Sequence, residues 1–172
     1  KPNYFKIGLF VIIALCLLVA AVIFFGSGMF TKEKIYFETY FNGSVSGLSI
    51  GAPVEVRGVK MGQVEKIVFA GDYYNIPRDS DEYFKIGNMV LVLASFDAGF
   101  CPPNMTVEDM SQNVTKLNTL GFRLRLESNI LTGQAFLQGE YLDPNLYPSI
   151  KIPWEPRHCY ISYPPILSLI QG

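Results

Sequence analysis

The stretch GLSIGAPVEVRGVKMGQVEKI (residues 47–67) contains two short runs in which apolar and polar side chains alternate. Residues 54–57 read Val-Glu-Val-Arg, Gly58 follows, and residues 59–69 form a second run that is interrupted at Gly62. A period of two is typical of a β-strand whose two faces differ, and a short loop with glycine joins antiparallel neighbours. The stretch therefore predicts a tight β-hairpin with a bulge.

Gly43, Gly47 and Gly51 are spaced four residues apart just before the hairpin. A phosphate-binding loop would need Gly-Lys-Ser or Gly-Lys-Thr at its end, and a helix-packing GxxxG motif would need an apolar spanning helix. This stretch is polar and ends at Pro53, so it fits neither motif. We interpret the glycines as turn positions.

The segments on either side of the hairpin also have strand patterns. Residues 35–41 alternate and predict a strand with one buried face, with Ile35, Phe37, Thr39 and Phe41 on one side and Tyr36, Glu38 and Tyr40 on the other. Residues 88–96 are apolar on both faces, which favours a central strand. Residues 71–85 hold Asp, Asn, Pro and Tyr without periodicity and predict a long surface loop between two strands.

The second half of the chain continues this pattern. A short helix is predicted over residues 107–117, after two prolines. Two more strands are predicted over residues 122–127, where Phe122, Leu124 and Leu126 alternate with Arg123, Arg125 and Glu127, and over residues 134–142. Between these strands lies a turn, residues 128–133, which we call the tip loop. Many short strands broken by turn residues indicate a mostly β domain, either a barrel or a sandwich.

The N-terminal segment has a different character, because residues 7–31 carry no charged side chain. About 24 helical residues reach roughly 36 Å, enough to span a hydrocarbon core of about 30 Å. We predict a transmembrane helix over residues 7–30. The alternative is a cleaved signal peptide, whose apolar region of about 7 to 15 residues would be shorter. Lys1 and Lys6 favour a cytoplasmic N-terminus, residues 1–6, and an exported domain.

The charge, the length and the motifs of the chain argue against some classes of function. The chain has 172 residues and a formal net charge of −1, from 14 Lys plus Arg against 15 Asp plus Glu. This near-neutral balance does not indicate a nucleic-acid partner. A length of 172 residues suits one domain plus an anchor. The sequence has no nucleotide-binding motif, so any ATP hydrolysis would come from a partner, and no cofactor is predicted.

The cysteines and the single histidine suggest no catalytic or metal site. Cys16 lies within the apolar segment, whereas Cys101 and Cys159 lie in the exported part, where an oxidising compartment would allow a disulfide between them. Two separate thiols remain the alternative. His158 lies in the Pro-rich stretch IPWEPRHCY without a nucleophile elbow and is interpreted as a surface histidine. Neither a zinc site nor a catalytic site is predicted.

The acidic residues of the long loop are a second candidate for catalysis. Asp79, Asp81 and Glu82 are paired carboxylates in a polar segment and are interpreted as solvated charge. The sequence therefore does not predict an enzyme.

Three stretches resemble the mammalian cell entry (MCE) family of lipid-transport proteins, which includes MlaD-like and PqiB-like members. YFKIGLFVII followed by GSGMF is similar to the anchor of single-span members, and LGFRLRLESNILTGQAFLQGEYLDP is similar to a strand, pore loop and strand of PqiB-like members. The block at residues 47–67 resembles the core signature of the family, which it matches at Gly47, Leu48, Gly51, Pro53, Val54, Gly58, Val59, Gly62 and Val64.

The resemblance implies a seven-stranded β-barrel over residues 31–148. It also implies assembly into a ring of six subunits around a hydrophobic channel, with an ABC-type permease and ATPase that drive phospholipids or other hydrophobic molecules between membranes. The implied location is the bacterial inner membrane, single-pass, with the domain in the periplasm.

The tip loop carries the candidate lipid contacts. Ile130 and Leu131 are aliphatic residues on a turn, where Asn, Gly or Asp would be preferred, so a neighbouring loop could cover them. The resemblance instead implies that they line the pore. Asn129 and Thr132 would either meet the lipid headgroup or cap the turn, and we favour capping.

The C-terminal segment is expected to lie outside the β domain. Residues 149–172 are predicted to form a Pro-rich linker and, after Pro164 and Pro165, the start of a C-terminal helix. PqiB-like proteins carry a helix after their last domain, so the chain is hypothesised to be a piece of a longer protein.

A rival function is that of a signal-anchored extracellular binding glycoprotein with a β-sandwich domain. Its support is the set of sequons that begin at Asn42, Asn104 and Asn113.

Overall fold

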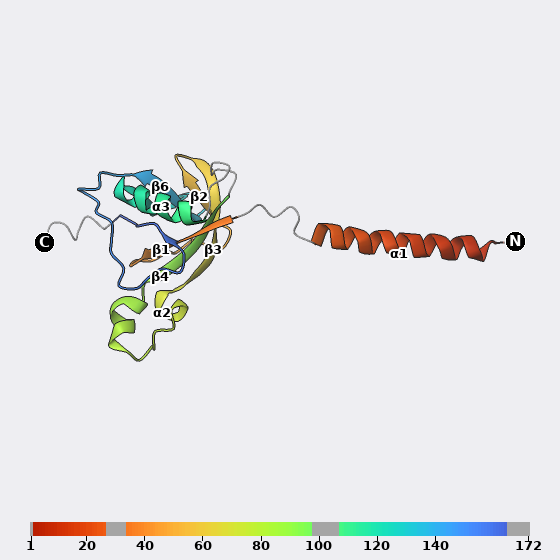
Figure 1. Ribbon diagram of the computed structural model, residues 1–172, viewed down its shortest axis with the longest axis horizontal. Helices are drawn as coiled ribbons and strands as arrows, with labels where there is room; N and C mark the ends of the chain where they lie inside the picture. The colour runs from red at the N-terminus through yellow and green to blue at the C-terminus, as the bar shows by residue number, and fades with distance from the viewer. Residues whose placement is uncertain (1, 27–33, 98–106, 165–172) are drawn as a thin grey trace. The chain divides into compact units, whose positions relative to one another are not determined.

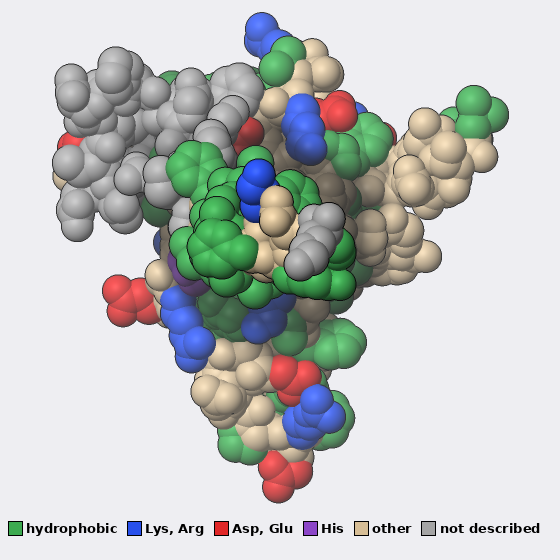
Figure 2. Space-filling model, turned by 90° about the vertical axis from the view of Figure 1, so that its right-hand side faces the viewer, with side chains coloured by type: hydrophobic (Ala, Val, Ile, Leu, Met, Phe, Trp, Pro, Cys, Tyr) green, Lys and Arg blue, Asp and Glu red, His purple; other side chains and the backbone are tan. Residues whose placement is uncertain are grey.

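The computed structural model describes residues 2–26, 34–97 and 107–164, and the chain divides into two compact units between Lys32 and Glu33. The first unit contains α1 (Tyr4–Gly26), which confirms the predicted apolar helix and begins before residue 7. By length and composition α1 can cross a membrane, and none of its residues is buried within the chain. Figure 2 views this helix from one end and shows hydrophobic side chains around it, with a basic side chain at the near end.

The second unit is built on one seven-stranded sheet, which confirms the mostly β fold. In spatial order the strands run β5-β6-β2-β3-β4-β1-β7 (Figure 1). Their bounds are β1 Lys34–Phe41, β2 Pro53–Val56, β3 Val59–Phe69, β4 Val90–Asp97, β5 Phe122–Ser128, β6 Ala135–Tyr141 and β7 Cys159–Tyr160.

The sheet curls into a half-barrel whose two edges approach each other. The Leu124 amide in β5 donates to the carbonyl of Ser162, two residues beyond β7, at 3.0 Å. Helix α3 (Val107–Thr119), predicted over 107–117, packs against β5 and β7 and contributes Val114 to the core. The inner core therefore lies inside the curl, with Phe37, Val54, Val64, Val92, Leu124, Leu137 and Ile161 among its buried members.

The predicted β2–β3 hairpin is confirmed. Arg57 and Gly58 form its two-residue turn, and both have positive φ, 52° and 81°. Such a turn matches the right-handed twist of the strands it joins. The register of β2 against β3 shifts between Val54 and Glu55, which is the predicted bulge.

Gly62 lets β3 approach β4 more closely than any other residue would allow. A Cβ atom built at this position would lie 1.7 Å from the carbonyl oxygen of Ser95 and 2.7 Å from its carbonyl carbon. Because the obstacle is backbone, no change of side-chain rotamer can relieve it. Gly62 therefore interrupts the apolar run of β3 for a steric reason.

The prediction that β1 has a single buried face is wrong. Phe37 and Thr39 are buried toward one side, and Glu38 and Tyr40 are equally buried toward the other. The reason is that the outer face of β1 and β4 supports a second, smaller core containing Tyr40, Ala70 and Leu91. The central position predicted for β4 is confirmed, since it pairs with both β1 and β3.

The long surface loop predicted over residues 71–85 does join two strands, β3 and β4, but it is not without regular structure. This connection contains α2 (Ala70–Tyr73) and a π-helical turn, η1 (Tyr83–Gly87). Gly71 is buried, and a Cβ there would lie 2.4 Å from the ring of Tyr83, so the two turns pack directly on each other. Two turns this short have no helical periodicity to detect, and their stability comes from packing on the outer core.

The seventh strand lies within the segment that the sequence assigned to a linker. Strand β7 pairs in parallel with β1, and Ile161 and Ser162 beyond it are fully buried. Two residues are too few for a periodic pattern, and the surrounding prolines obscure the strand further. The predicted start of a C-terminal helix falls on residues 165–172, outside the described residues.

Arg123 is buried although it alternates with the core residues Phe122 and Leu124. It is 1% exposed, and its guanidinium donates to the carbonyls of Tyr147 (2.9 and 3.1 Å), Asn118 (2.8 Å) and Phe122 (2.7 Å). These bonds tie the α3–β5 turn to the loop after β6, so the charge is buried with partners.

Candidate functional site

The tip loop joins β5 to β6 and carries the most exposed aliphatic side chains of the described part of the domain. Ile130 is 97% exposed and Leu131 is 95% exposed. The alternative in which a neighbouring loop of the same chain covers them is therefore wrong. No charged residue occurs from Ser128 to Phe136, so the surface around the pair is neutral.

The turn is held by its own hydrogen bonds. The Asn129 amide donates to the Gln134 carbonyl at 2.9 Å, and the Gly133 amide donates to the Asn129 carbonyl at 2.8 Å. The Asn129 Oδ1 accepts from the amides of Leu131 (2.9 Å) and Thr132 (3.4 Å), and the Thr132 Oγ1 accepts from the Gln134 amide. Both side chains thus cap the turn, and Ile130 and Leu131 project from an ordered frame.

We predict that Asn129→Ala loosens the tip loop. Losing the Oδ1 acceptor leaves the Leu131 amide without its partner, which costs about 1 kcal/mol locally. Amide hydrogen exchange at Leu131 should become roughly fivefold faster while exchange in β4 stays unchanged. Asn129→Asp keeps an acceptor and is the matched control; equal exchange rates in both variants would contradict the capping role.

Two glycines of the core signature, Gly47 and Gly51, lie beside the base of this loop. Gly47 has φ +84°, its carbonyl accepts from the Ala135 amide at 2.9 Å, and a Cβ there would lie 2.4 Å from the Gly133 carbonyl oxygen. Gly51 also has positive φ, and its amide donates to the Val64 carbonyl at 2.8 Å. The signature therefore builds a rigid support on which the tip loop rests.

The other residues of the core signature lie in the core or in the strands and turns of the domain. Val54 and Val64 are fully buried, Leu48 packs against the inner core, Pro53 begins β2, and Val59 begins β3 beside the Gly58 turn. None of these side chains projects with Ile130 and Leu131. The glycine-lined turn at residues 47–51 contacts the end of the tip loop through Gly47.

A shallow hollow of about 450 Å³ separates this turn from the tip loop. Ser49, Ile50 and Gly51 line one side, and Asn129, Thr132 and Phe136 are among the residues of the other. Ile50 is 69% exposed. Ile50 was not predicted as a site residue, although an aliphatic residue on a turn between Gly47 and Gly51 is a detectable signal in the sequence.

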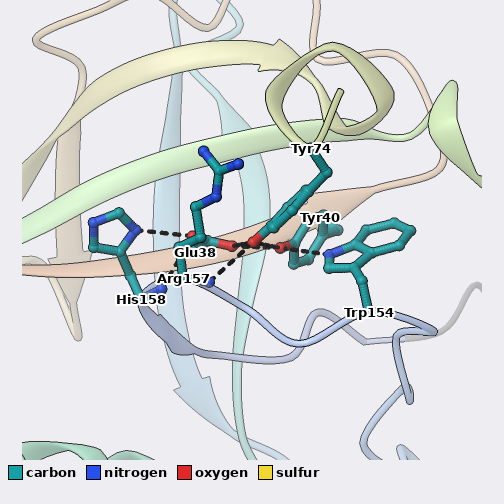
Figure 3. A network of polar contacts seen from close by, with 6 residues as sticks. All are labelled: Glu38, Tyr40, Tyr74, Trp154, Arg157 and His158. Atoms are coloured by element: carbon teal, nitrogen blue, oxygen red, sulfur yellow. Dashed lines mark hydrogen bonds and ion pairs between the residues drawn. The ribbon is translucent and has the colours of Figure 1, made fainter. Parts of the chain in front are cut away.

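A separate group of polar side chains lies on the outer face of β1, and Figure 3 shows its members, which we call the Glu38 cluster: Glu38, Tyr40, Tyr74, Trp154, Arg157 and His158. Glu38 is fully buried, and its Oε2 accepts from the hydroxyls of Tyr40 and, at 2.7 Å, Tyr74. Its Oε1 accepts from the His158 amide at 3.2 Å and lies 2.8 Å from the Nδ1 of His158.

The cluster joins three parts of the chain. Trp154 Nε1 donates to the Tyr40 hydroxyl at 2.9 Å, and the Arg157 amide donates to the Tyr74 hydroxyl at 3.0 Å. Strand β1, the turn after α2 and the C-terminal segment therefore meet at one carboxylate. His158 is a partly buried member of this cluster, so its interpretation as a surface histidine is wrong; the sequence separation of 120 residues from Glu38 hid the contact.

Burial and the hydrogen bond to Glu38 perturb the tyrosines. Burial is the largest cause of the shift, and the hydrogen bond to Glu38 is the second. Together they raise the pKa of Tyr74 to about 12 and raise the pKa of Tyr40 well above its usual value. Burial also raises the pKa of Tyr160 to about 12. The folded domain therefore favours the neutral phenols.

We predict that the domain loses stability at alkaline pH. A pKa raised on folding contributes stability that is complete below the unfolded value of about 10 and is lost as the pH rises through the folded value. The free energy of unfolding should fall between pH 10 and about 12, followed in detergent by the fluorescence of Trp154, the single tryptophan. Tyr74→Phe should make this decline shallower, and an equally steep decline would refute the assignment.

The cysteines and the acidic residues named from the sequence form no metal site within the described residues. Cys159 begins β7, whereas Cys101 and Asn104 lie outside the described residues, so the disulfide remains a prediction. Asp79, Asp81 and Glu82 are exposed near η1. Within residues 2–26, 34–97 and 107–164, no group of three or more His, Cys, Asp or Glu side chains is placed to hold a metal ion.

Comparison with solved structures finds similarity to a chain of the "Acinetobacter MlaFEDB complex in ATP-bound Vtrans1 conformation". The two chains are 15% identical, and the match covers 94% of this chain and 91% of that chain with a TM-score of 0.47.

Comparison with protein families finds that residues 33–138 match the family described as MlaD protein. The match covers more than half of the 172 residues and includes the core signature, the Glu38 strand and the whole tip loop. It confirms the resemblance stated from the sequence. The chain is therefore a member of the MlaD family of MCE-domain proteins.

Proposed function

We propose that this protein is a subunit of an ABC-type lipid-transport system and that several copies form a ring around a hydrophobic channel. The observation that carries the proposal is the nearly complete exposure of Ile130 and Leu131 on an ordered, uncharged turn of an MlaD-family domain. Two adjacent aliphatic side chains held in water without a partner indicate a contact beyond the single chain.

A ring explains that contact. In cyclic symmetry every copy presents the same residues at the same distance from the axis, so one exposed pair per subunit becomes a closed aliphatic collar. A lipid tail gains about 0.8 kcal/mol for each CH₂ group kept from water, and such a collar supplies this shelter without a catalytic group. Ring formation, with six subunits as the expected number, is supported by family membership and by the surface of the tip loop.

The remaining parts of the system would come from partners. The sequence has no nucleotide-binding motif, so a permease and an ATPase would supply the energy, as the family implies. Helix α1 would anchor each copy in the bacterial inner membrane with a cytoplasmic N-terminus, and the domain would lie in the periplasm. The cargo would be a phospholipid or another hydrophobic molecule, and the protein itself would act as a conduit and not as an enzyme.

The assembly can be tested by purifying the full chain from its native membrane in mild detergent. We expect mass photometry to show one oligomer and cryo-electron microscopy to show a ring of cyclic symmetry with lipid bound at the tip loops. Monomers alone, or a ring with the tip loops on its outer rim, would refute the proposal. Sugar on the native protein would instead favour the extracellular glycoprotein.

A further inference from the structure

Two loops with exposed aliphatic side chains emerge side by side at one end of the sheet. Strands β2 and β6 pair in parallel, with Val54 opposite Leu137, so the segments that precede them lie at the same end. The segment before β6 is the tip loop. The segment before β2 is the turn at residues 49–52, which we call the Ile50 turn.

The Ile50 turn is as well ordered as the tip loop. The Ala52 amide donates to the Ser49 carbonyl at 3.0 Å, and Ala52 in turn accepts from the Val64 amide at 2.8 Å. Gly51 supplies the positive φ that the turn needs, 86°, and Ala52 is buried beneath it. The frame therefore fixes the backbone on both sides of Ile50, which leaves its side chain 69% exposed.

The two loops are rigidly coupled. The Gly47 carbonyl accepts from the Ala135 amide at 2.9 Å, and Gly47 has no side chain where the Gly133 carbonyl passes. The hollow of about 450 Å³ lies between the loops, with Ile50 on one wall and Asn129 and Thr132 on the other. Ile50 and the tip loop thus border the same concave surface.

This surface suits an alkyl chain. From Val45 to Val54 the chain carries no charge, and the tip loop and its flanks carry none from Ser128 to Phe136. Glu55 is the one charged residue among those that line the hollow. The apolar part of the lining consists of Ile50, Ala52, Pro53, Ala135 and Phe136, and no lining residue is a cation that would hold a phosphate.

We propose that Ile50 is a second lipid contact, which binds the acyl chain of the transported lipid on the far side of the hollow from Ile130 and Leu131. This inference rests on the proposed function and deepens it, because it assigns a lipid-contacting residue outside the tip loop. A lipid chain would leave the collar of tip loops and pass along the Ile50 turn, so that its methylene groups stay in apolar contact over a longer path.

The proposal can be tested by photocrosslinking in the full, membrane-embedded chain. Ile50, Leu131 or Leu146 is replaced, one at a time, by p-benzoylphenylalanine. Leu146 is the matched control, since it is aliphatic and 62% exposed but follows the other end of β6. After irradiation and removal of free lipid, covalent adducts are identified by mass spectrometry. We expect adducts at positions 50 and 131 at least about fivefold above position 146.

The outcomes separate this inference from the function on which it rests. Adducts at position 131 with only background at position 50 would overturn the role of Ile50 and leave the channel intact. Adducts of position 50 with a neighbouring protein chain would overturn it as well. Background at both positions would refute the lipid channel and, with it, the role of Ile50.

Substitution supplies a second readout. Ile50→Ser should slow lipid transfer between vesicles roughly fivefold, because apolar contact is lost while the exposed site adds no folding penalty. Ile50→Leu should retain the rate, and Leu146→Ser should leave it unchanged. Equal rates for Ile50→Ser and Leu146→Ser would contradict the proposal, provided that both melt at the temperature of the unaltered protein.

Discussion

Replacing Ile130 and Leu131 together with aspartate should abolish lipid transfer, with a loss of at least about a hundredfold. In a ring each subunit would contribute two carboxylates to the collar, and a lipid tail would have to displace their hydration to pass. Transfer is measured with the purified complex between donor and acceptor vesicles. The domain should fold normally, because both side chains are almost fully exposed and make little contribution to either core.

The control for this experiment keeps the chemistry and changes the shape. Exchanging the two residues, Ile130→Leu with Leu131→Ile, preserves the apolar surface and should keep transfer within about twofold of the unaltered protein. Melting temperatures of both double variants should equal that of the parent. Undiminished transfer by the aspartate variant would show that lipid does not pass the tip loop and would remove the basis of the channel.

Replacing Gly62 with alanine should prevent the domain from folding stably. The added Cβ would lie 1.7 Å from the Ser95 carbonyl oxygen, so β3 and β4 must separate at the centre of the sheet. We expect a loss of about 4 kcal/mol or more, which is a large part of the stability of a domain this size. Thermal unfolding in detergent, followed by near-ultraviolet circular dichroism and Trp154 fluorescence, measures it.

Gly43→Ala is the matched control for the same change. A Cβ at Gly43 meets nothing within 4 Å, and its φ is not in the left-handed region. This variant should unfold within about 0.5 kcal/mol of the parent. If Gly62→Ala were equally stable, the close approach of the two strands would be wrong, and the reason for a glycine in the core signature would have to be sought elsewhere.

The strand pattern predicted most of the sheet because it is a local property. Alternation marked residues 35–41, 54–57, 59–69 and 122–127, an apolar run marked residues 88–96, and strand residues between turns marked 134–142; each of these segments contains a strand in the structure. Prediction failed where the stabilising contact is distant in sequence. The turns α2 and η1 are too short to be helical without the outer core, and β7 needs β1 to be recognised as a strand.

The candidate site also has one part that the local sequence predicted and another part that only the fold revealed. Ile130 and Leu131 were conspicuous in the sequence, because aliphatic residues are unusual on a turn. Their lack of cover could be known only from the fold, which leaves them 97% and 95% exposed. Ile50 gave a similar but weaker signal, and the parallel pairing of β2 with β6 is what brings its turn beside the tip loop.

Spacing and composition alone were sufficient for the apolar anchor, the hairpin and the family, since each depends on residues close together in the chain. The Glu38 cluster, the burial of Arg123 and the shared hollow were accessible only in three dimensions. Each depends on groups separated by many residues, as with Glu38 and His158, which are 120 residues apart and 2.8 Å from each other. A local pattern records which face of a segment is apolar, but not which distant segment will cover it.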